Sequence, residues 1–331
     1  MTDAFVWRGR RVLVTGATGI VGSWVVKTLL ERGATVVALL LDIDPQCELV
    51  RSGDIHKVKQ VFGALEDYAA VERAVGVWEV DVVIHLGAQT LVGVAARSPV
   101  ATFDANIRGT YHLLDACRVH ASMIKSVVVA SSDKAYGSSS ELPYTEQTPL
   151  RAQHPYDVSK ACADLLTQTY HDTYGLPALV ARCGNIYGGG DLNWTRIVPG
   201  TIRSLLRGER PIVRSDGTFV RDYLYVKDAA SAYVCLAEAA YTGRLRGGAV
   251  NVGGSARRTV LEVIADLQRL TGRTDLSPDI RNTAQAEIRE QWLSFDKATQ
   301  TLGWTPAYTM DQGLRETLDW YRRWFGDWER S

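Results

Sequence analysis

Short apolar runs alternate along the first half of the chain with stretches in which apolar residues recur at helical spacing. The runs occupy 11–15, 34–41, 80–86, 126–130 and 178–181. After the first run, one predicted helix face ends before Gly33 and comprises Ile20, Val21, Val25, Val26, Leu29 and Leu30. Continuous apolar runs are typical of strands buried on both faces, and their alternation with helices is typical of βαβ units. The pattern predicts an α/β fold, a doubly wound parallel sheet covered by helices on both faces.

The pattern changes after Arg182, where glycine and proline become frequent. Later segments predict a short strand over 249–252, a helix over 261–271 and an aromatic tail with Trp304, Trp320, Trp324 and Trp328. We therefore predict a first domain over 1–181, to which 222–245 returns, and a smaller α/β domain over 182–331. Aromatic side chains serve more often as packing than as cofactor ligands, so the tail tryptophans are expected to close a small core or an interface.

Composition narrows the function classes. The 331 residues include 37 Lys plus Arg and 37 Asp plus Glu, so no excess positive charge exists to neutralise nucleic-acid phosphates. With 46% hydrophobic and 22% charged residues, the chain is too apolar to be disordered. Its cysteines form no CxxC pair, which argues against disulfides or a metal site; they are Cys47, Cys117, Cys162, Cys183 and Cys235. No stretch approaches the roughly 20 apolar residues of a membrane helix, so we expect a cytoplasmic protein.

Three glycines, Gly16, Gly19 and Gly22, lie between the first predicted strand and its helix. In a dinucleotide-binding turn the first glycine permits the tight turn, the second admits the pyrophosphate, and the third lets helix and strand pack closely. The N–H groups and dipole of the helix N-terminus then face the phosphates. A plain glycine turn is the alternative. The strand–turn–helix context favours a Rossmann-type dinucleotide-binding domain.

The end of the second predicted strand bears on the choice of dinucleotide. An acidic residue there binds the adenosine ribose of NAD, whereas a basic residue favours NADP. This strand ends in Leu41, Asp42, Ile43 and Asp44, with no Lys or Arg. The sequence therefore favours NAD over NADP, with Asp42 as the ribose ligand. A solvated loop aspartate is the equal alternative for Asp42.

Tyr156 and Lys160 are four residues apart on a predicted helix, so they share one face. A nearby ammonium lowers the pKa of a phenol and makes it a usable base. Two exposed helix residues are the alternative. Ser131, Ser132, Asp133 and Lys134 follow a buried strand, and open α/β sheets bind their ligands at such strand ends.

Seven motifs occur in one order along nearly the whole chain: TGATGIVG at 15–22, HLGAQ at 85–89, NIRGT at 106–110, SSDKAYG at 131–137, YDVSK at 156–160, RCGNIYGGG at 182–190 and RDYLYV at 221–226. As a set they resemble the extended short-chain dehydrogenase/reductase family acting on nucleotide sugars. The SDK triplet, HLGAQTLV and GNIYGGGD followed by RIVP are most similar to the CDP-glucose 4,6-dehydratase group.

This resemblance implies catalytic roles. Ser132, Tyr156 and Lys160 match the family triad: Tyr156 would deprotonate the sugar 4-hydroxyl while NAD takes the C4 hydride, and Lys160 would also bind the nicotinamide ribose. Asp133 and Lys134 match a pair that dehydratases use and 4-epimerases lack. Asp133 would protonate the leaving 6-hydroxyl, and Lys134 would remove the C5 proton before hydride returns to C6. A local ion pair that only shapes the loop is the alternative for Asp133 and Lys134.

The resemblance also implies binding roles. The cofactor would contact Gly16, Gly19, Ile20, Gly22, Asp42, Ala64, Leu65, Leu86, Ala88, Tyr156 and Lys160. The nucleotide sugar would contact Gln89, Asn185, Arg221 and, as a weaker candidate, Arg196. Asn106 would support the active-site helix. Arginine suits a diphosphate because its planar fork donates paired hydrogen bonds; an ion pair with Asp222 is the alternative for Arg221.

Two departures from the family pattern and two competing functions qualify this assignment. Gly63-Ala64-Leu65 replaces the Gly-Asp pair usual at the adenine, and Arg221-Asp222-Tyr223 is more typical of the broad family, so the nucleotide base stays open. A 4-epimerase and a non-catalytic NAD-sensing scaffold are the competing functions.

The family also implies a homodimer, in which two helices would pair with the partner's copies through Leu113, Leu114, Ala116, Cys117, Cys162, Leu165, Leu166 and Tyr170. Core packing within one chain is the alternative.

Overall fold

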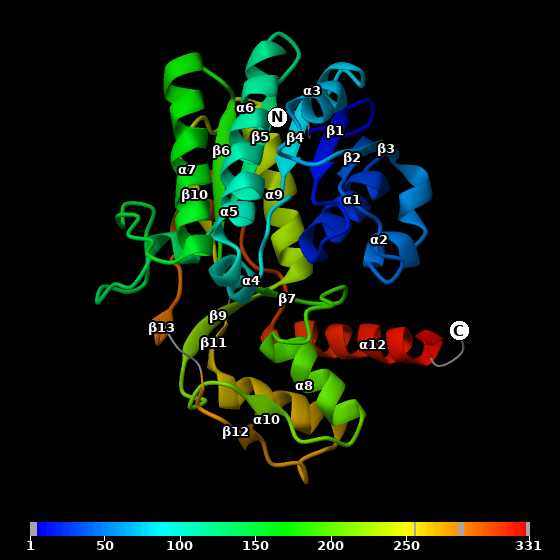
Figure 1. Ribbon diagram of the computed structural model, residues 1–331, viewed down its shortest axis with the longest axis vertical. Coiled ribbons are helices and arrows are strands. Elements are labelled where there is room, and N and C mark those ends of the chain that lie inside the picture. Colours follow the sequence, from blue (N-terminus) through cyan, green and yellow to red (C-terminus); the bar gives the residue numbers. More distant parts are fainter. Residues whose placement is uncertain (1–4, 255, 284–287, 329–331) are drawn as a thin grey trace.

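The computed structural model describes residues 5–254, 256–283 and 288–328, and of Trp328 only the backbone. Its centre is a seven-stranded sheet in the order β10-β6-β5-β4-β1-β2-β3 (Figure 1). The strands are β1 (Arg11–Thr15), β2 (Thr35–Leu40), β3 (Lys59–Phe62), β4 (Val82–His85), β5 (Ser126–Ser132), β6 (Ala178–Cys183) and β10 (Ala249–Val252). All neighbours pair in parallel. The strand order reverses between β1 and β4, where such sheets form a ligand crevice.

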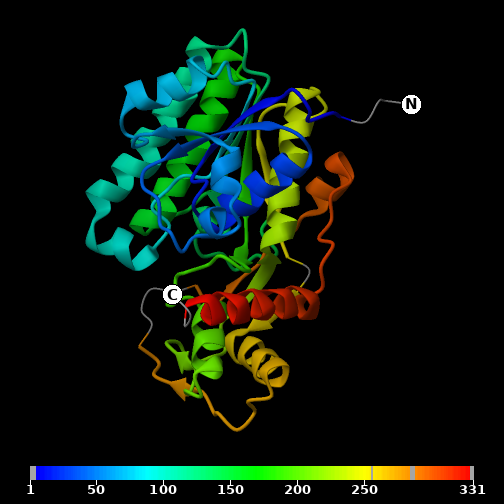
Figure 2. The ribbon, with the colours of Figure 1, turned by 90° about the vertical axis from the view of Figure 1, so that its right-hand side faces the viewer.

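Helices cover both faces of this sheet, which confirms the predicted doubly wound α/β fold (Figure 2). One face carries α1 (Ile20–Glu31), α9 (Val226–Tyr241) and α11 (Asp296–Leu302). The other carries α3 (Tyr68–Gly76), α6 (Gly109–Val119) and α7 (Pro155–Tyr174). The remaining helices of this half are α2 (Glu48–Arg51), η1 (Asp54–Lys57), α4 (Val92–Arg97), α5 (Pro99–Phe103), η2 (Asp104–Arg108) and η3 (Asp133–Tyr136).

The second half forms a smaller layer below the carboxyl ends of the sheet strands (Figure 1). Its strands are β7 (Asn185–Tyr187), β8 (Ile212–Val213), β9 (Val220–Tyr225), β11 (Ala256–Thr259), β12 (Asp279–Ile280) and β13 (Glu290–Gln291). Its helices are α8 (Ile197–Leu206), α10 (Val260–Thr271) and α12 (Met310–Trp328). Strand β9 pairs with β7, β11 and β13.

The tail tryptophans pack as expected, with one outside the described side chains. Trp320 and Trp324 are buried and stacked, with ring centroids 6.5 Å apart, in the core of the second half. Trp304 packs into the core beneath α9, and its indole N–H donates to the hydroxyl of Ser231. The side chain of Trp328 is among those not described. These rings therefore build cores.

One expectation about a strand needs correction, and one strand was missed. The predicted strand at 249–252 is β10, which pairs with β6 in the central sheet instead of belonging to the second half. Strand β3 escaped the pattern because it is an edge strand in which only Val61 is buried. Both β10 and α9 follow residue 182 in the sequence but pack with the central sheet. The domain boundary at 181/182 therefore stays a prediction.

The helix faces expected at a dimer interface differ from the prediction. Leu113, Leu114, Ala116 and Cys117 of α6 are 0% exposed because they pack beneath the sheet, so they are core residues. On α7, by contrast, Leu165 is 56% exposed. The five cysteines are free thiols, and burial raises the pKa of Cys117 and Cys183 to about 12. Among the described residues, no helix is long and apolar enough to cross a membrane.

Candidate functional site

The glycine turn joins β1 to α1 at the crevice of the sheet. Gly16 has a φ of 68°, and a Cβ there would lie 2.7 Å from the backbone nitrogen of Gly87. A Cβ on Gly22 would collide with the carbonyl oxygen of Gly16, so close helix–strand contact requires glycine. Gly19 caps α1 without a side-chain hydrogen bond. The turn thus leaves the leading N–H groups of α1 available to an anion.

A buried polar chain fixes the adjoining end of β4. Thr15 Oγ1 lies 2.7 Å from His85 Nδ1 and accepts hydrogen bonds from the backbone N–H groups of Leu86 and Gly87. Burial lowers the pKa of His85 to about 3, so this imidazole stays neutral. The loop that carries Leu86 and Ala88 is therefore held directly beside the glycine turn.

Asn106 links that loop to the helix that carries Tyr156. Its amide oxygen accepts from the backbone N–H of Gln89 at 2.7 Å, and its amide nitrogen donates to the Gln89 carbonyl. The same amide nitrogen donates to Ser159 Oγ on α7 at 2.8 Å. The Gln89 side chain accepts from the backbone N–H of Leu91. Asn106 thus has the supporting place that the sequence predicted for it.

A cavity of about 220 Å³ opens between the glycine turn and the second half of the chain. It is lined by Thr18, Gly19, Ile20, Asp44, Cys47, Thr90, Leu91, Gly190, Asp191, Leu192, Asn193 and Arg196. Arg196 brings a cation to it and pairs with Asp191, with Nη1 and Oδ2 3.1 Å apart. A glycine cradle, an uncapped helix N-terminus and a cation fit a dinucleotide or nucleotide phosphate. Asp191 and Asn193 were missed, although both follow the GNIYGGG motif.

Asp42, the predicted ribose ligand, is followed by a second acid, Asp44, in the loop after β2. Asp42 lies exposed, two residues past the end of β2. Asp44, two residues further on, lines the cavity and accepts the backbone N–H of Gln46 at 2.8 Å. Asp44 is therefore better placed than Asp42 to reach a bound dinucleotide from this loop.

Ala64 and Leu65 follow β3 at the same edge of the sheet as the glycine turn. Leu65 packs against the core and lies so close to Gly87 and Gly109 that a Cβ on either glycine would meet its side chain. Leu65 therefore lies beside the loop after β4. The contact of Ala64 and Leu65 with the adenine stays a prediction.

Ser132 and Asp133 form a buried pair at the end of β5. Ser132 Oγ donates to Asp133 Oδ1 at 2.9 Å and accepts the backbone N–H of Lys134. Asp133 is 2% exposed, and its other oxygen has no hydrogen-bond partner. Burial raises the pKa of this carboxyl, against the opposing charges of Lys134 and Arg221. A raised pKa favours the protonated form that a general acid needs.

Tyr156 and Lys160 lie on the first turns of α7, facing Ser132. Lys160 is 6% exposed and donates to the carbonyl of Ala130 at 2.9 Å. Burial lowers the pKa of Lys160 to about 8 and raises the pKa of Tyr156 to about 12. The charge of Arg196 and a hydrogen bond with Ser132 oppose the rise at Tyr156. Without a cofactor, therefore, the protein does not show the expected fall in the pKa of Tyr156 through Lys160.

A second buried carboxyl near Asp133 escaped the sequence analysis. Asp222 on β9 is 1% exposed, accepts the backbone N–H of Leu293 at 3.3 Å, and approaches Gly184 so closely that a Cβ would collide. Burial, reinforced by the charge of Asp133, raises the pKa of Asp222 to about 8. The RDY motif named this aspartate, but only the fold shows its burial beside Asp133.

The predicted substrate residues come from neighbouring strands. Asn185 on β7 is in register with Tyr223 on β9, two residues from Arg221. Arg221 is buried, and its charge reaches Asp133. Successive strand residues point to opposite faces, so Arg221 and Asp222 lie on opposite sides of β9. Arg196 lies at the other end of this region, in the cavity beside the glycine turn.

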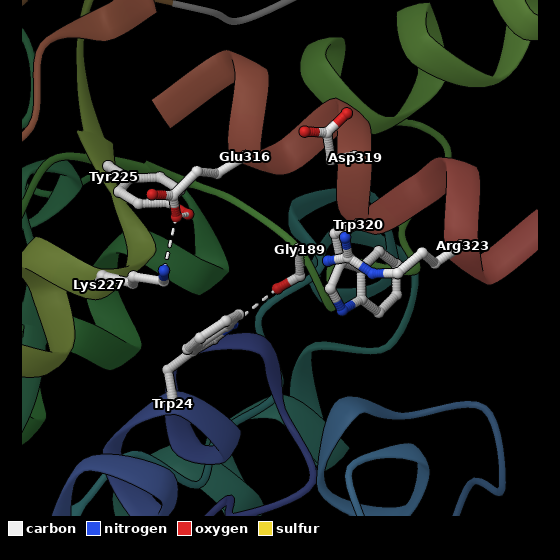
Figure 3. A pocket seen from close by; sticks show the side chains of 8 residues that line it. All are labelled: Trp24, Gly189, Tyr225, Lys227, Glu316, Asp319, Trp320 and Arg323. Carbon is white, nitrogen blue, oxygen red and sulfur yellow. Dashed lines mark hydrogen bonds and ion pairs between the residues drawn. The ribbon is translucent and has the colours of Figure 1, made fainter. Parts of the chain in front are cut away.

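A second cavity, of about 250 Å³, lies where α1, α9 and α12 meet (Figure 3). Its side chains bind one another: Lys227 pairs with Glu316 at 2.6 Å, and the indole N–H of Trp24 donates to the Gly189 carbonyl. All the predicted site residues are described, and none of them lines it. The chemistry predicted from the sequence therefore lies at the sheet crevice and not here.

The comparisons with known proteins agree with this geometry. The family model described as GDP-mannose 4,6 dehydratase matches residues 13–317. The CDP-glucose 4,6-dehydratase of Salmonella typhimurium is 29% identical, over 98% of this chain and 94% of its own.

Two solved structures also match. The dTDP-glucose 4,6-dehydratase DesIV of Streptomyces venezuelae, with NAD and TYD bound, superposes with a TM-score of 0.87 at 27% identity, covering 97% of this chain and 99% of its own. The UDP-glucose 4-epimerase of Thermus thermophilus, in complex with NAD, has a TM-score of 0.81 at 31% identity, covering 94% and 99%. The family model spans both halves of the fold and the whole crevice described above. This chain belongs to the GDP-mannose 4,6 dehydratase family.

Proposed function

We propose that this protein is an NAD-dependent nucleotide-sugar 4,6-dehydratase that converts an NDP-hexose to the NDP-4-keto-6-deoxyhexose. The observation that carries the proposal is the buried Asp133, placed directly after Ser132 and followed by Lys134, opposite the helix of Tyr156 and Lys160. This arrangement supplies one set of groups for oxidation at C4 and another for loss of water. The similarity to a CDP-glucose 4,6-dehydratase supports a CDP-glucose-like substrate.

Oxidation at C4 needs a base for the 4-hydroxyl. Tyr156 takes this role, and the hydrogen bond with Ser132 and the charge of Arg196 both oppose the rise in its pKa that burial causes. Lys160 holds α7 against β5 through the Ala130 carbonyl and is placed to bind the nicotinamide ribose. Bound NAD would supply the hydride acceptor for C4 and the hydride donor for C6, and its positive nicotinamide would favour ionisation of the phenol.

Loss of water follows from the acidity of C5 beside the new C4 ketone. Lys134 takes the C5 proton as base, and Asp133 donates its proton to the 6-hydroxyl, so that the C6–O bond breaks and water leaves. Burial raises the pKa of Asp133, which favours the protonated form this step needs.

The diphosphate is assigned to Arg196, Arg221 and Asn185. Arg196 lines the cavity at the glycine turn, and Arg221 lies buried within electrostatic reach of Asp133. The bonds that Asn106 makes to the backbone of Gln89 support the assignment of Gln89 to the sugar. These local cations explain how a chain of zero net charge binds an anionic substrate.

A 4-epimerase is the second candidate, because a UDP-glucose 4-epimerase shares this fold at 31% identity. Epimerisation needs only the oxidation groups and has no use for a buried carboxyl and amine at 133 and 134. The pair therefore favours the dehydratase. We place the enzyme in the cytoplasm, since its five cysteines are free thiols as expected in a reducing compartment.

We further propose that the enzyme is a homodimer paired through α7 and its surroundings. Leu165 and Tyr174 on α7 are each 56% exposed, and Val119 at the end of α6 is 55% exposed. Exposed apolar side chains on α7 and α6 are the kind that an association surface would cover. Light scattering that gives a mass near the 36.5 kDa of one chain would contradict the dimer.

The activity is tested by incubating the protein and NAD with CDP-, GDP-, UDP- and dTDP-hexoses. Mass spectrometry should find a product lighter by one water for one of them, with the CDP-hexose as the expected substrate. Tyr156→Phe serves as the matched control, because it keeps the ring and removes the base. A product of unchanged mass from every sugar, with inverted C4, would show an epimerase instead.

A further inference from the structure

Arg182 belongs to the RCGN motif, yet neither catalysis nor binding uses it. It lies on β6 with its side chain 5% exposed, and it contacts two different catalytic segments. One is α7, which carries the oxidation pair Tyr156 and Lys160. The other is η3, which carries the elimination pair Asp133 and Lys134.

On the α7 side, Arg182 forms a bidentate ion pair with Asp164. Nε lies 2.7 Å from Oδ2, Nη2 lies 3.0 Å from Oδ1, and the Asp164 side chain is 0% exposed. Asp164 lies four residues after Lys160 and eight after Tyr156, so all three occupy one face of the helix. A two-pronged contact of this kind fixes the orientation of the helix as well as its distance.

On the η3 side, Arg182 donates from Nη1 to the hydroxyl of Tyr136 at 2.8 Å. That hydroxyl donates in turn to Asn251 Oδ1 on β10 at 2.7 Å. Tyr136 follows Asp133 by three residues, and residues three apart in a 3₁₀ turn lie above one another. The Tyr136 hydroxyl therefore anchors the turn that carries the elimination pair.

The same guanidinium also holds the loop that follows η3. Nη1 donates to the carbonyl of Glu146 at 3.2 Å, and the Glu146 carboxylate accepts the backbone N–H of Asn251. The Asn251 amide nitrogen donates to the carbonyl of Tyr144. One buried cation thus connects helix, turn, loop and sheet, and each connection is a hydrogen bond with defined direction.

We propose that Arg182, held between Asp164 and Tyr136, is a positioning residue that sets the distance between the oxidation pair on α7 and the elimination pair on η3. This inference rests on the proposed dehydratase function. A dehydratase needs such a device because one sugar must meet Tyr156 at C4 and then Asp133 and Lys134 at C5 and C6 without leaving. Misplacement by about 1 Å costs on the order of a hundredfold in rate.

Tyr136→Phe tests the inference with little threat to folding. The variant keeps the ring, which stacks on Tyr144 with centroids 4.9 Å apart, and removes only the hydroxyl between Arg182 and Asn251. The burst of enzyme-bound NADH that reports C4 oxidation should keep the wild-type rate. Water loss should slow by about tenfold or more, so that NADH and the 4-keto-hexose accumulate during turnover.

A second variant and a control separate positioning from general damage. Asn251→Ala removes the acceptor of the same hydroxyl and should show the same imbalance between the two steps. Tyr225→Phe removes another phenol bonded to a charged side chain, Glu316 at 2.7 Å, away from both segments, and should change neither step. Thermal unfolding of each variant measures any loss of folded protein.

Each outcome of these assays is decisive. An NADH burst at the wild-type rate together with slowed water loss in Tyr136→Phe and Asn251→Ala supports the inference. Equal slowing of both steps overturns the inference, because a merely structural contact changes both steps together. Wild-type behaviour in both variants also overturns it, because the contact then affects neither step. If the wild-type protein itself oxidises C4 but releases no water, the proposed function fails first and the inference falls with it.

Discussion

The glycine turn gives the sharpest prediction, since Gly16→Ala should damage both stability and NAD binding. A residue other than glycine pays about 1–2 kcal/mol in the left-handed region, and Gly16 has a φ of 68°. The added Cβ would also lie 2.7 Å from Gly87 N and 2.8 Å from Gly87 Cα. Crowding of this kind costs about a further 1–3 kcal/mol. The total loss of unfolding free energy is therefore about 2–5 kcal/mol.

Gly272→Ala is the matched control for backbone strain. Gly272 has a φ of 70° at the end of α10, and a Cβ there would meet nothing within 4 Å. It should lose only about 1–2 kcal/mol and keep full NAD affinity. Urea unfolding followed by tryptophan fluorescence measures the first quantity, and isothermal titration with NAD the second.

In Gly16→Ala, NAD affinity should fall by about tenfold or more, because the turn and the loop at Gly87 must move apart. The reasoning is refuted if Gly16→Ala loses no more stability than Gly272→Ala and still binds NAD as wild type does.

Three further predictions concern the charged groups of the site. Asp133→Asn should preserve C4 oxidation but slow water loss by about a hundredfold or more, measured as trapped NADH against released product; equal loss of both steps would count against its role as acid. Arg196→Ala should raise the KM for the NDP-hexose and move the acid limb of the pH profile of kcat/KM to higher pH, because its charge lowers the pKa of Tyr156; an unmoved limb would contradict this. The pKa of Asp222 is raised from 3.8 to about 8, so its stabilising contribution is complete below its unfolded pKa and is lost as pH rises through about 8. Urea titrations between pH 3.8 and about 8 should therefore show the unfolding free energy of wild type falling more steeply with pH than that of Asp222→Asn. Parallel curves would rule out a raised pKa of Asp222 in the folded protein.

Local features of the fold were predictable from the sequence. Strand β1 and the glycine turn follow from a strand of five residues, four of them buried, and from the spacing of three glycines, both visible within twelve residues. Pairing between strands far apart in the chain was not predictable from the sequence. The pattern predicts a strand at 249–252, but its partner β6 lies far away in the chain, so the strand was assigned to the wrong half.

The candidate site shows the same limit. Sequence motifs identified Ser132, Tyr156 and Lys160, and the fold brings these three residues to one crevice. The roles of Arg182 and Asp222 depend on burial and on which side chains meet, and sequence spacing contains neither. The pKa of Tyr156 likewise depends on desolvation, which outweighs the nearby cations in this protein.

The fate of the hydride at C4 tests the central claim most directly. An NDP-hexose carrying deuterium at C4 is incubated with the protein and NAD, and the product is examined by nuclear magnetic resonance. The account predicts that the deuterium moves to C6 of a 4-keto-6-deoxyhexose, while C5 acquires a proton from solvent. Deuterium that returns to C4 of an inverted hexose, with the 6-hydroxyl retained, would contradict the account.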